Sequence, residues 1–395
     1  MKLLVINSGS SSIKYKLFSD KDNLVEAKGL IEKIGLKRGI LTHKSQGEKI
    51  CLEQEIPDHN QGINLLFSFL TREGGELTSL EELSSVGHRV VHGGEYYANA
   101  VIIDDSVIKA IEECSSLAPL HNPANLAGIL AVKNLLPDIC QVAVFDTAFH
   151  QSMQPEGYLY PLPEWVYKKH KVRKYGFHGS SHAYISRRAA KLMDKKLSEL
   201  NLITFHLGNG ASMAAISEGK CIDTTMGFTP LDGLVMGTRC GSIDPAIIIY
   251  LAKLGYDLDR IDTLVNKESG LKGLSGVSSD MRDLQEVMHK NPRAQLALDI
   301  FARRVKMYLG SYYALLGKVD GFIFSGGIGE NDEYIRGEIL QGLENLGIEL
   351  DEDSNSKILF GKEGRISKKN ATDIWVIPTD EEGFIASETR KLTRG

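Results

Sequence analysis

Apolar and polar positions repeat in two similar hairpins about half the chain apart. Residues 3–18 predict a buried apolar strand, a turn rich in glycine and serine, and a second strand in which Ile13, Tyr15 and Leu17 alternate with polar positions. Residues 202–216 repeat this order around a turn of glycine, asparagine and serine. The repeat predicts a duplicated α/β domain with a cleft between the copies, each turn facing a shared ligand.

Helical spacing is clearest in residues 292–316, where apolar side chains recur at three- and four-residue steps. Asn291 is the expected N-cap and Gly317 the expected end of this helix. Its apolar face is compatible with either a dimer interface or the protein core. Residues 122–136 have similar spacing and predict a second helix with Asn122 as its N-cap.

Three further strands are predicted to end in polar or glycine-rich turns, in residues 84–94, 141–150 and 319–331. The second of them ends at Asp146. The third leads through glycines into an amphipathic helix whose apolar positions run to Leu346. A strand, a glycine turn and a helix in succession are typical of a phosphate or nucleotide site, because backbone amides and the helix N-terminus face anions.

Prolines and basic residues between 158 and 175 predict a linker into the second copy. We therefore expect an N-terminal domain at residues 1–150 plus 382–395. A C-terminal domain of the same type, with most of the nucleotide contacts, is expected at residues 151–381. The candidate hinges are residues 155–165 and the return near 381.

The composition limits the classes of function. A chain of 395 residues with 42% apolar and 25% charged residues is long enough for two globular domains. Its net charge of −5 gives no reason to expect a nucleic-acid or anionic-membrane partner, so any anion must be met by local charges. The apolar runs are too short for a membrane helix or a signal peptide, which predicts a cytoplasmic protein. Five scattered cysteines suggest neither a disulfide scaffold nor a zinc site.

Candidate anion-binding groups lie in the turns of both hairpins. Ser10, Ser12 and Lys14 offer donors to phosphate oxygens in the first, and residues 206–210 repeat the pattern in the second. A polar hairpin with a solvated lysine is the alternative reading. The chain has no GxxxxGK[ST] motif, so it is not a P-loop nucleotide hydrolase.

Two arginines in glycine-rich surroundings suggest phosphoryl chemistry. Arg89 precedes Gly93 and Gly94, and Arg239 lies in GTRCGSIDP. A planar guanidinium can neutralise the oxygens of a phosphoryl group in transfer, although many arginines are only surface charge.

Two histidines and a carboxylate cluster are further candidates. His178 and His121 lie in turns, where a histidine either stabilises a developing charge or plays an ordinary structural part. The carboxylates at residues 380–382 follow a strand, where they suit Mg²⁺ or are simply solvated.

These motifs together resemble a known family. Nine of them occur in one order across residues 4–386: INSGSSSIKYKLF, GHRVVHGG, PLHNPAN, FDTAFH, YGFHGSSH, HLGNGAS, GTRCGSIDPA, SGGIGEN and IPTDEE. They resemble the acetokinase family of the acetate and sugar kinase, heat-shock 70 and actin superfamily. The departures are Ser8, where a smaller apolar residue or cysteine is usual, and Ser242, where an acid is common.

The resemblance implies two ribonuclease H-like, actin-like ATPase domains with an interdomain cleft. It also implies transfer of the γ-phosphate of ATP to acetate, giving ADP and acetyl phosphate, with Mg²⁺ or alternatively Mn²⁺, in a cytoplasmic homodimer. Propionate or another short-chain fatty acid is an alternative acceptor. A nucleotide switch without enzymatic activity is an alternative from a different class.

The resemblance also implies roles for individual residues. The catalytic residues it implies are Arg89, Asp146, His178, Asn209 and Arg239, and the magnesium ligands are Asn7 and Glu381. The implied nucleotide contacts, together with Ser10 and Ser12, are Lys14, His206, Leu207, Gly208, Asn209, Gly210, Asp280, Met281, Arg282, Gly327, Ile328, Gly329, Glu330 and Asn331. The implied contacts to the acceptor are Arg89, Val91, Leu120, Phe177 and Pro230.

Direct in-line transfer is the mechanism we expect, with Arg89 and Arg239 flanking the phosphoryl group and His178 donating a hydrogen bond. A phosphorylated carboxylate on Glu381 or Asp146 is the rival. A carboxylic acid is already ionised at neutral pH, so we expect Asp146 to position magnesium-bound water and Arg89 rather than to move a proton.

Overall fold

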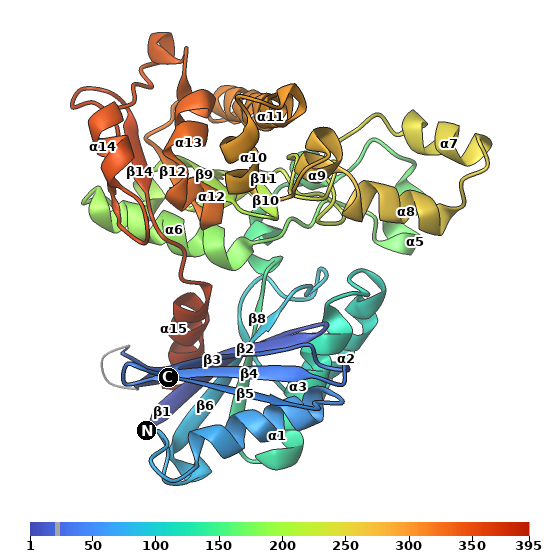
Figure 1. Ribbon diagram of the computed structural model, residues 1–395, viewed down its shortest axis with the longest axis vertical. Helices are drawn as coiled ribbons and strands as arrows, with labels where there is room; N and C mark the ends of the chain where they lie inside the picture. The colour runs from blue at the N-terminus through green and yellow to red at the C-terminus, as the bar shows by residue number, and fades with distance from the viewer. Residues whose placement is uncertain (20–23, 395) are drawn as a thin grey trace. The chain divides into compact units, whose positions relative to one another are not determined.

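Two mixed β-sheets with helices packed on them make up the structure, a computed structural model that describes residues 1–19 and 24–394 (Figure 1). The chain divides into two units. The first contains Met1–Gln151 and Asp380–Gly395, and the second contains Ser152–Thr379. In the part of the chain that is described, no helix has both the length and the apolar character needed to cross a membrane.

The first unit contains an eight-stranded sheet in the order β5-β4-β3-β2-β1-β6-β8-β7. Its strands are β1 (Lys2–Gly9), β2 (Ser12–Ser19), β3 (Val25–Glu32), β4 (Gly39–Ser45), β5 (Glu48–Gln54), β6 (Leu83–Val90), β7 (Val101–Ile102) and β8 (Cys140–Phe145). Its helices are α1 (His59–Leu70), α2 (Asp105–Glu113), α3 (Asn122–Leu135) and α15 (Glu381–Thr393). Helices α3 and α15 both pack on the central strands β1 and β6.

The second unit contains a six-stranded sheet in the order β11-β10-β9-β12-β14-β13. Its strands are β9 (Asn201–Leu207), β10 (Ala211–Ser217), β11 (Lys220–Thr224), β12 (Gly321–Ser325), β13 (Gly364–Arg365) and β14 (Asp373–Val376). Its helices are α4 (Pro155–Tyr158), α5 (Glu164–His170), α6 (Gly179–Leu192), α7 (Ala246–Lys253), α8 (Leu258–Lys267), α9 (Gly270–Ser275), α10 (Met281–Val287), α11 (Pro292–Leu316), α12 (Gly326–Asn331), α13 (Glu333–Leu340) and α14 (Glu352–Lys357).

The two sheets share one pattern of five strands. In the first, β1 pairs antiparallel with β2 and β2 with β3, while β6 and then β8 continue from β1 in parallel. In the second, β9, β10 and β11 form the antiparallel part, and β12 and then β14 continue in parallel. The duplicated α/β architecture predicted from the two hairpins is therefore present.

Helix α11 has the bounds that the apolar spacing predicts. The side chain of Asn291 accepts hydrogen bonds from the backbone of Arg293 and Ala294, and Gly317 ends the helix with a positive φ of 69°. Leu298 and Phe301 are buried inside the unit. Core packing thus accounts for the apolar face that was also compatible with a dimer interface.

Two helix boundaries differ from the prediction. The N-cap of α3 is His121 rather than Asn122, because the Asn122 side chain is engaged with the backbone of His92. Helix α13 ends at Leu340 and does not continue to Leu346, because Gly342 takes a positive φ of 76° that breaks the helical geometry.

The predicted linker at residues 158–175 is instead part of the second unit. It contains α5, and its end is fixed by hydrogen bonds from the backbone of Lys174 to Tyr158 and of Tyr175 to Gly227. The prolines and charges of this segment suggested a linker. The segment nevertheless packs on the second unit, because the ring of Tyr175 is fully buried. The carboxylates at residues 380–382 follow the strand β14, as predicted, and they lie at the start of α15.

Candidate functional site

Polar side chains gather on the face of the first sheet that α15 covers. Asn7 of β1 pairs with Lys14 of β2. A Cβ placed on Gly87 of β6 would meet Thr389 of α15, so this face of β6 is turned toward that helix. Arg89, two residues further on, shares the face because side chains alternate along a strand. The strand period therefore brings an amide and two cations together beneath α15.

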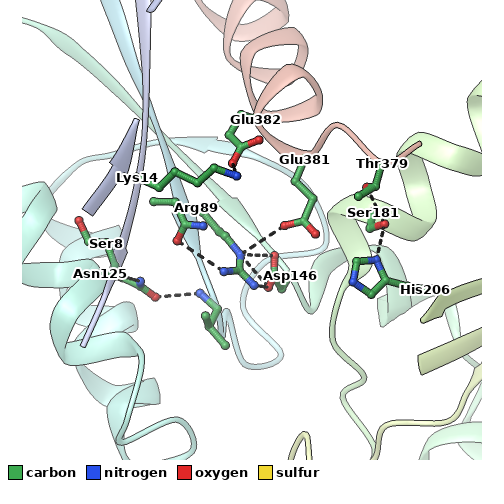
Figure 2. A network of polar contacts seen from close by, with 12 residues as sticks. Ser8, Lys14, Arg89, Asn125, Asp146, Ser181, His206, Thr379, Glu381 and Glu382 are labelled. Carbon is green, nitrogen blue, oxygen red and sulfur yellow. Dashed lines mark hydrogen bonds and ion pairs between the residues drawn. The ribbon is translucent and has the colours of Figure 1, made fainter. Parts of the chain in front are cut away.

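Arg89 is joined to Asp146 by three hydrogen bonds (Figure 2). Nε of Arg89 donates to both carboxylate oxygens of Asp146, at 3.2 and 3.0 Å, and Nη2 donates to Oδ2 at 2.6 Å. Its Nη1 donates to Oδ1 of Asn7 at 3.4 Å, and Glu381 lies 3.9 Å from Nε. Burial alone would lower the pKa of Arg89, but the carboxylates of Asp146 and Glu381 outweigh it and raise the pKa.

The first turn of α15 supplies carboxylates to the lysines of β2. Glu382 pairs with Lys14 at 2.5 Å and with Lys16 at 3.1 Å, and Lys16 also reaches Asp380 at 2.8 Å. Burial would raise the pKa of Glu382, but the two lysines lower it overall. Burial does raise the pKa of Glu381, which Arg89 opposes. Asp380 caps the helix by accepting a hydrogen bond from the backbone of Gly383.

The oxygen donors near Arg89 suit a magnesium ion. Asn7, Asp146 and Glu381 present amide and carboxylate oxygens, which are hard ligands of the kind Mg²⁺ prefers. Within residues 1–19 and 24–394, no cluster of three or more acidic, histidine or cysteine side chains is placed to hold a metal alone. Mg²⁺ commonly binds through one or two carboxylates plus substrate phosphates, so the donor set fits a metal that arrives with a nucleotide.

The loop after β6 is held by side chains of α3. Oδ1 of Asn125 accepts a hydrogen bond from the backbone of Val91 at 2.9 Å, and its Nδ2 donates to the carbonyl of Ser8 at 2.6 Å. Asn122 pairs with the backbone of His92 in both directions. Val91 is buried as a result, whereas Leu120, another predicted acceptor contact of this unit, is 69% exposed.

In the second unit, His178 lies at the start of α6 in the left-handed region, with φ of 56°. Its Nδ1 is 2.8 Å from Oγ of Ser212, which is also 2.9 Å from Nε2 of His182. The His178 ring lies beside that of His206, with centroids 4.2 Å apart. Figure 2 shows His206 joined to Ser181, which is in turn joined to Thr379. A hydrogen-bonded network therefore fixes the direction of both rings.

Four of the predicted residues converge around the turn between β9 and β10. A Cβ placed on Gly210 would lie 3.5 Å from Cε1 of His178 and 3.7 Å from Nη1 of Arg239. Beside it, the amide of Asn209 packs so closely on Gly237 that any side chain there would clash with it. Glycine at position 237 is what allows this approach, whereas a Cβ at position 210 would make only ordinary van der Waals contacts.

Arg239 is partly buried, and none of the described carboxylates pairs with it. Burial lowers its pKa. The contacts that its Nη1 makes with described residues are long, at 3.4 Å to the carbonyl of Pro230 and 3.6 Å to the sulfur of Met236. A desolvated guanidinium without a counter-ion is well suited to an anionic ligand. The remaining predicted acceptor contact, Phe177, is buried next to His178 in the chain.

A cavity of about 730 Å³ opens next to this turn, within the range of a nucleotide site. Eight of its lining residues are predicted nucleotide contacts: Gly208, Asn209, Asp280, Met281, Arg282, Gly327, Ile328 and Asn331. Gly326 begins α12 with φ of 77°, and a Cβ there would lie 2.7 Å from the Leu207 carbonyl. The glycine turn after β12 therefore forms one side of a real cavity.

Two other predicted nucleotide contacts, Gly329 and Glu330, are not among the residues that line the cavity. Oε1 of Glu330 accepts hydrogen bonds from the backbone of Gly326 and Thr379, and the carbonyl of Gly329 accepts one from Arg336. Five lining residues were not predicted, namely Ser279, Gln285, Asp332, Glu333 and Phe360. Those next to predicted contacts in the chain needed only an extension of the motif, whereas no motif indicates Phe360.

Comparisons with known proteins agree with the motifs. The acetokinase family model matches residues 2–387. The acetate kinase of Thermoanaerobacterium thermosaccharolyticum is 52% identical over 397 residues, covering 99% of each chain. The crystal structure of Porphyromonas gingivalis acetate kinase matches with a TM-score of 0.95 at 45% identity and 99% coverage of both chains. A propionate kinase from Francisella tularensis matches with a TM-score of 0.92 at 42% identity, also over 99% of both. This chain belongs to the acetokinase family.

Proposed function

We propose that the chain transfers the γ-phosphate of ATP reversibly to acetate, forming ADP and acetyl phosphate. The observation that carries the proposal is the position of Gly210 between His178 and Arg239, next to Gly208 and Asn209 in the wall of the cavity. We infer that this hydrogen-bonding imidazole and this guanidinium without a counter-ion meet the terminal phosphate of a nucleotide bound in the cavity.

Phosphoryl transfer asks a protein mainly for alignment and charge neutralisation, because negative charge spreads over three oxygens in the transition state. Arg239 and Arg89 neutralise those oxygens, His178 donates a hydrogen bond and Asn209 orients the phosphate. Mg²⁺, for which Mn²⁺ is a substitute, supplies further charge neutralisation on the phosphates when it is bound. Asn7 and Glu381 are the residues that would hold it.

The acceptor is already ionised, so the reaction needs no general base. Asp146 holds the guanidinium of Arg89 in one orientation through its three hydrogen bonds. We assign Asp146 to positioning Arg89 and metal-bound water. In the rival mechanism, Glu381 or Asp146 accepts the phosphoryl group first, and the stereochemistry separates the two. Direct transfer inverts the configuration at a chiral phosphorus, and net retention would contradict it.

The acceptor pocket favours a two-carbon acid. Val91, Leu120, Phe177 and Pro230 are the proposed contacts to the methyl group, and Val91 leaves less room than alanine would. Each additional methylene changes discrimination by only about 1 to 3 kcal/mol. We therefore propose acetate as the preferred acceptor with propionate accepted more slowly, and a kcat/KM on butyrate equal to that on acetate would contradict this.

Trapping with hydroxylamine tests the proposed reaction directly. Protein, ATP, Mg²⁺, acetate and hydroxylamine should give acetyl hydroxamate, because acetyl phosphate reacts with hydroxylamine and acetate does not. A non-enzymatic nucleotide switch would bind ATP but yield none. Repeating the assay with propionate and butyrate measures the acceptor preference in the same experiment.

We further propose that the protein is a cytoplasmic homodimer that binds neither nucleic acid nor membranes. Helix α7 supports the dimer, because it has no buried residue and exposes Ile247, Ile249 and Tyr250. A second copy would cover this face. Ile249→Lys should then shift wild-type dimers toward monomers in sedimentation velocity, whereas Leu296→Lys, at an exposed position of α11, should not. A wild-type monomer would contradict the assignment.

A further inference from the structure

One exposed aromatic ring lines the nucleotide cavity. Phe360 follows α14, and its side chain is 85% exposed, which is the highest value among the large apolar residues that the structure describes. It contributes to the same cavity wall as Ile328, Met281 and Arg282. A single exposed apolar side chain needs no explanation by itself. The way in which the chain holds Phe360 in position is the more informative observation.

The backbone at Phe360 takes a conformation that side chains rarely adopt. Its φ is 54°, in the left-handed region that glycine favours. The backbone N–H of Phe360 donates to Oδ1 of Asn331 at 2.8 Å, and Nδ2 of Asn331 donates to the carbonyl of Gly327 at 2.9 Å. One amide side chain thus ties the aromatic residue to the glycine turn on the cavity wall.

A buried arginine also holds the glycine turn at residues 327–329 in place. Arg336 is fully buried and donates from Nη1 to the carbonyl of Gly329 at 2.9 Å. Its Nη2 donates to the carbonyls of Asn355 and Ile358, at 2.8 and 3.1 Å. One guanidinium therefore spans α12 and the end of α14, and it holds the residues just before Phe360 at a set distance from the glycine turn.

Another part of the wall offers a second flat group. Asp280 accepts hydrogen bonds from Nε and Nη2 of Arg282 at 3.0 and 2.7 Å, which keeps that exposed guanidinium in one orientation. Planar guanidinium groups and aromatic rings are the side chains on which nucleobases stack. The cavity thus contains two such groups on segments far apart in the chain, and both are held by hydrogen bonds.

We propose that Phe360 stacks on the base of the bound nucleotide and makes the site prefer purines over pyrimidines. The inference rests on the proposed function, because it takes the cavity to be the ATP site. A purine offers a larger face for stacking than a pyrimidine, so the ring contributes more to ATP binding than to UTP binding. Asn331 and Arg336 act as positioning residues for the ring.

Steady-state kinetics of Phe360→Ala tests the proposal, with Lys362→Ala as the matched control. Lys362 lies in the same turn, is exposed and is not part of the cavity wall. We expect Phe360→Ala to raise KM for ATP about five- to twentyfold and KM for UTP much less, with kcat within about twofold. Phe360→Trp should restore the ATP value. An unchanged ratio of the two KM values would overturn the proposal.

A binding measurement separates this inference from the proposed function. Phe360→Trp introduces a fluorophore at the site, and the wild type, with its two native tryptophans, supplies the background. We expect ATP to quench the added emission and inorganic tripolyphosphate, which has no base, to leave it unchanged. Equal responses to both probes would overturn the stacking role. Failure of the wild type to form acetyl hydroxamate would instead contradict the proposed function.

Discussion

The carboxylate of Asp146 accepts three hydrogen bonds from the guanidinium of Arg89, the shortest of which is 2.6 Å. The two residues come from neighbouring parallel strands, β6 and the end of β8, so the sheet itself sets their separation. The guanidinium of Arg89 is therefore held in one orientation before any phosphate binds. We propose that Asp146 acts mainly by fixing that orientation.

Asp146→Asn should lower kcat by about a hundredfold, because a misplaced guanidinium no longer matches the transferring group. We expect excess Mg²⁺ to restore part of the activity and the pH profile to keep its shape. Initial rates across Mg²⁺ concentration and pH provide the measurement. Asp105→Asn is the control, since that carboxylate is exposed and, among the described residues, pairs with Lys133 alone. A displaced pH profile without magnesium rescue would indicate proton transfer by Asp146.

Ser212→Ala removes the group that Nδ1 of His178 contacts at 2.8 Å. A lost hydrogen bond of this kind is worth about 0.5 to 1.5 kcal/mol, so we expect kcat to fall about two- to tenfold with KM for ATP nearly unchanged. Ser186→Ala on α6 is the control, because Ser186 is equally buried but its hydroxyl donates, within the described part of the chain, only to the carbonyl of Ala183. Equal kcat values for the two variants would show that the ring of His178 needs no support from Ser212.

The hairpins and α11 could be predicted because local pattern and tertiary role agree there. The apolar run of β1, the alternation in β2 and the caps of α11 are properties of a few neighbouring residues. The cap at Asn122 could not be predicted, because its amide is used by His92, thirty residues away. The end of α13 depends on the positive φ of Gly342, which the apolar spacing running on to Leu346 obscures.

The residues of the candidate site also fall into those with a local sequence signal and those placed only by the fold. Glycine turns such as those at residues 208–210 and 327–329 carry a local signal, and both lie at or beside the cavity. Phe360 has no such local signal in the sequence. Its place at the cavity depends on its backbone hydrogen bond to Asn331 and on the hydrogen bond from Arg336 to Ile358. Likewise, Arg89 and Asp146 are separate motifs in the sequence, and only the pairing of β6 with β8 makes them partners.

Ser8→Ala should stabilise the protein. The hydroxyl of Ser8 is buried against Gly128, and no hydrogen-bond partner for it exists in the described residues. An unsatisfied buried hydroxyl costs about 1 to 3 kcal/mol, so its removal should raise the unfolding free energy by about 1 kcal/mol. Urea unfolding measures the change. Ser212→Ala should lower stability instead, since that hydroxyl is satisfied, and a loss of stability in Ser8→Ala would show that its hydroxyl has a partner.

His88 should make the first unit sensitive to acid. Its ring is buried in β6 with Nε2 2.8 Å from Oε1 of Gln141, and burial lowers its pKa from 6.5 to about 4, against the opposing effect of Gln141. Between those values the unfolded chain binds a proton that the folded chain does not, so the unfolding free energy falls as the pH drops. The loss approaches about 3 kcal/mol at pH 4, at about 1.4 kcal/mol per pH unit. Urea unfolding from pH 7 to 4 should show this slope in the wild type and a shallower one in His88→Gln, which cannot ionise. The two proteins differ only in the imidazole of His88, so any difference in slope comes from its titration. Equal slopes would therefore mean that other groups govern acid unfolding.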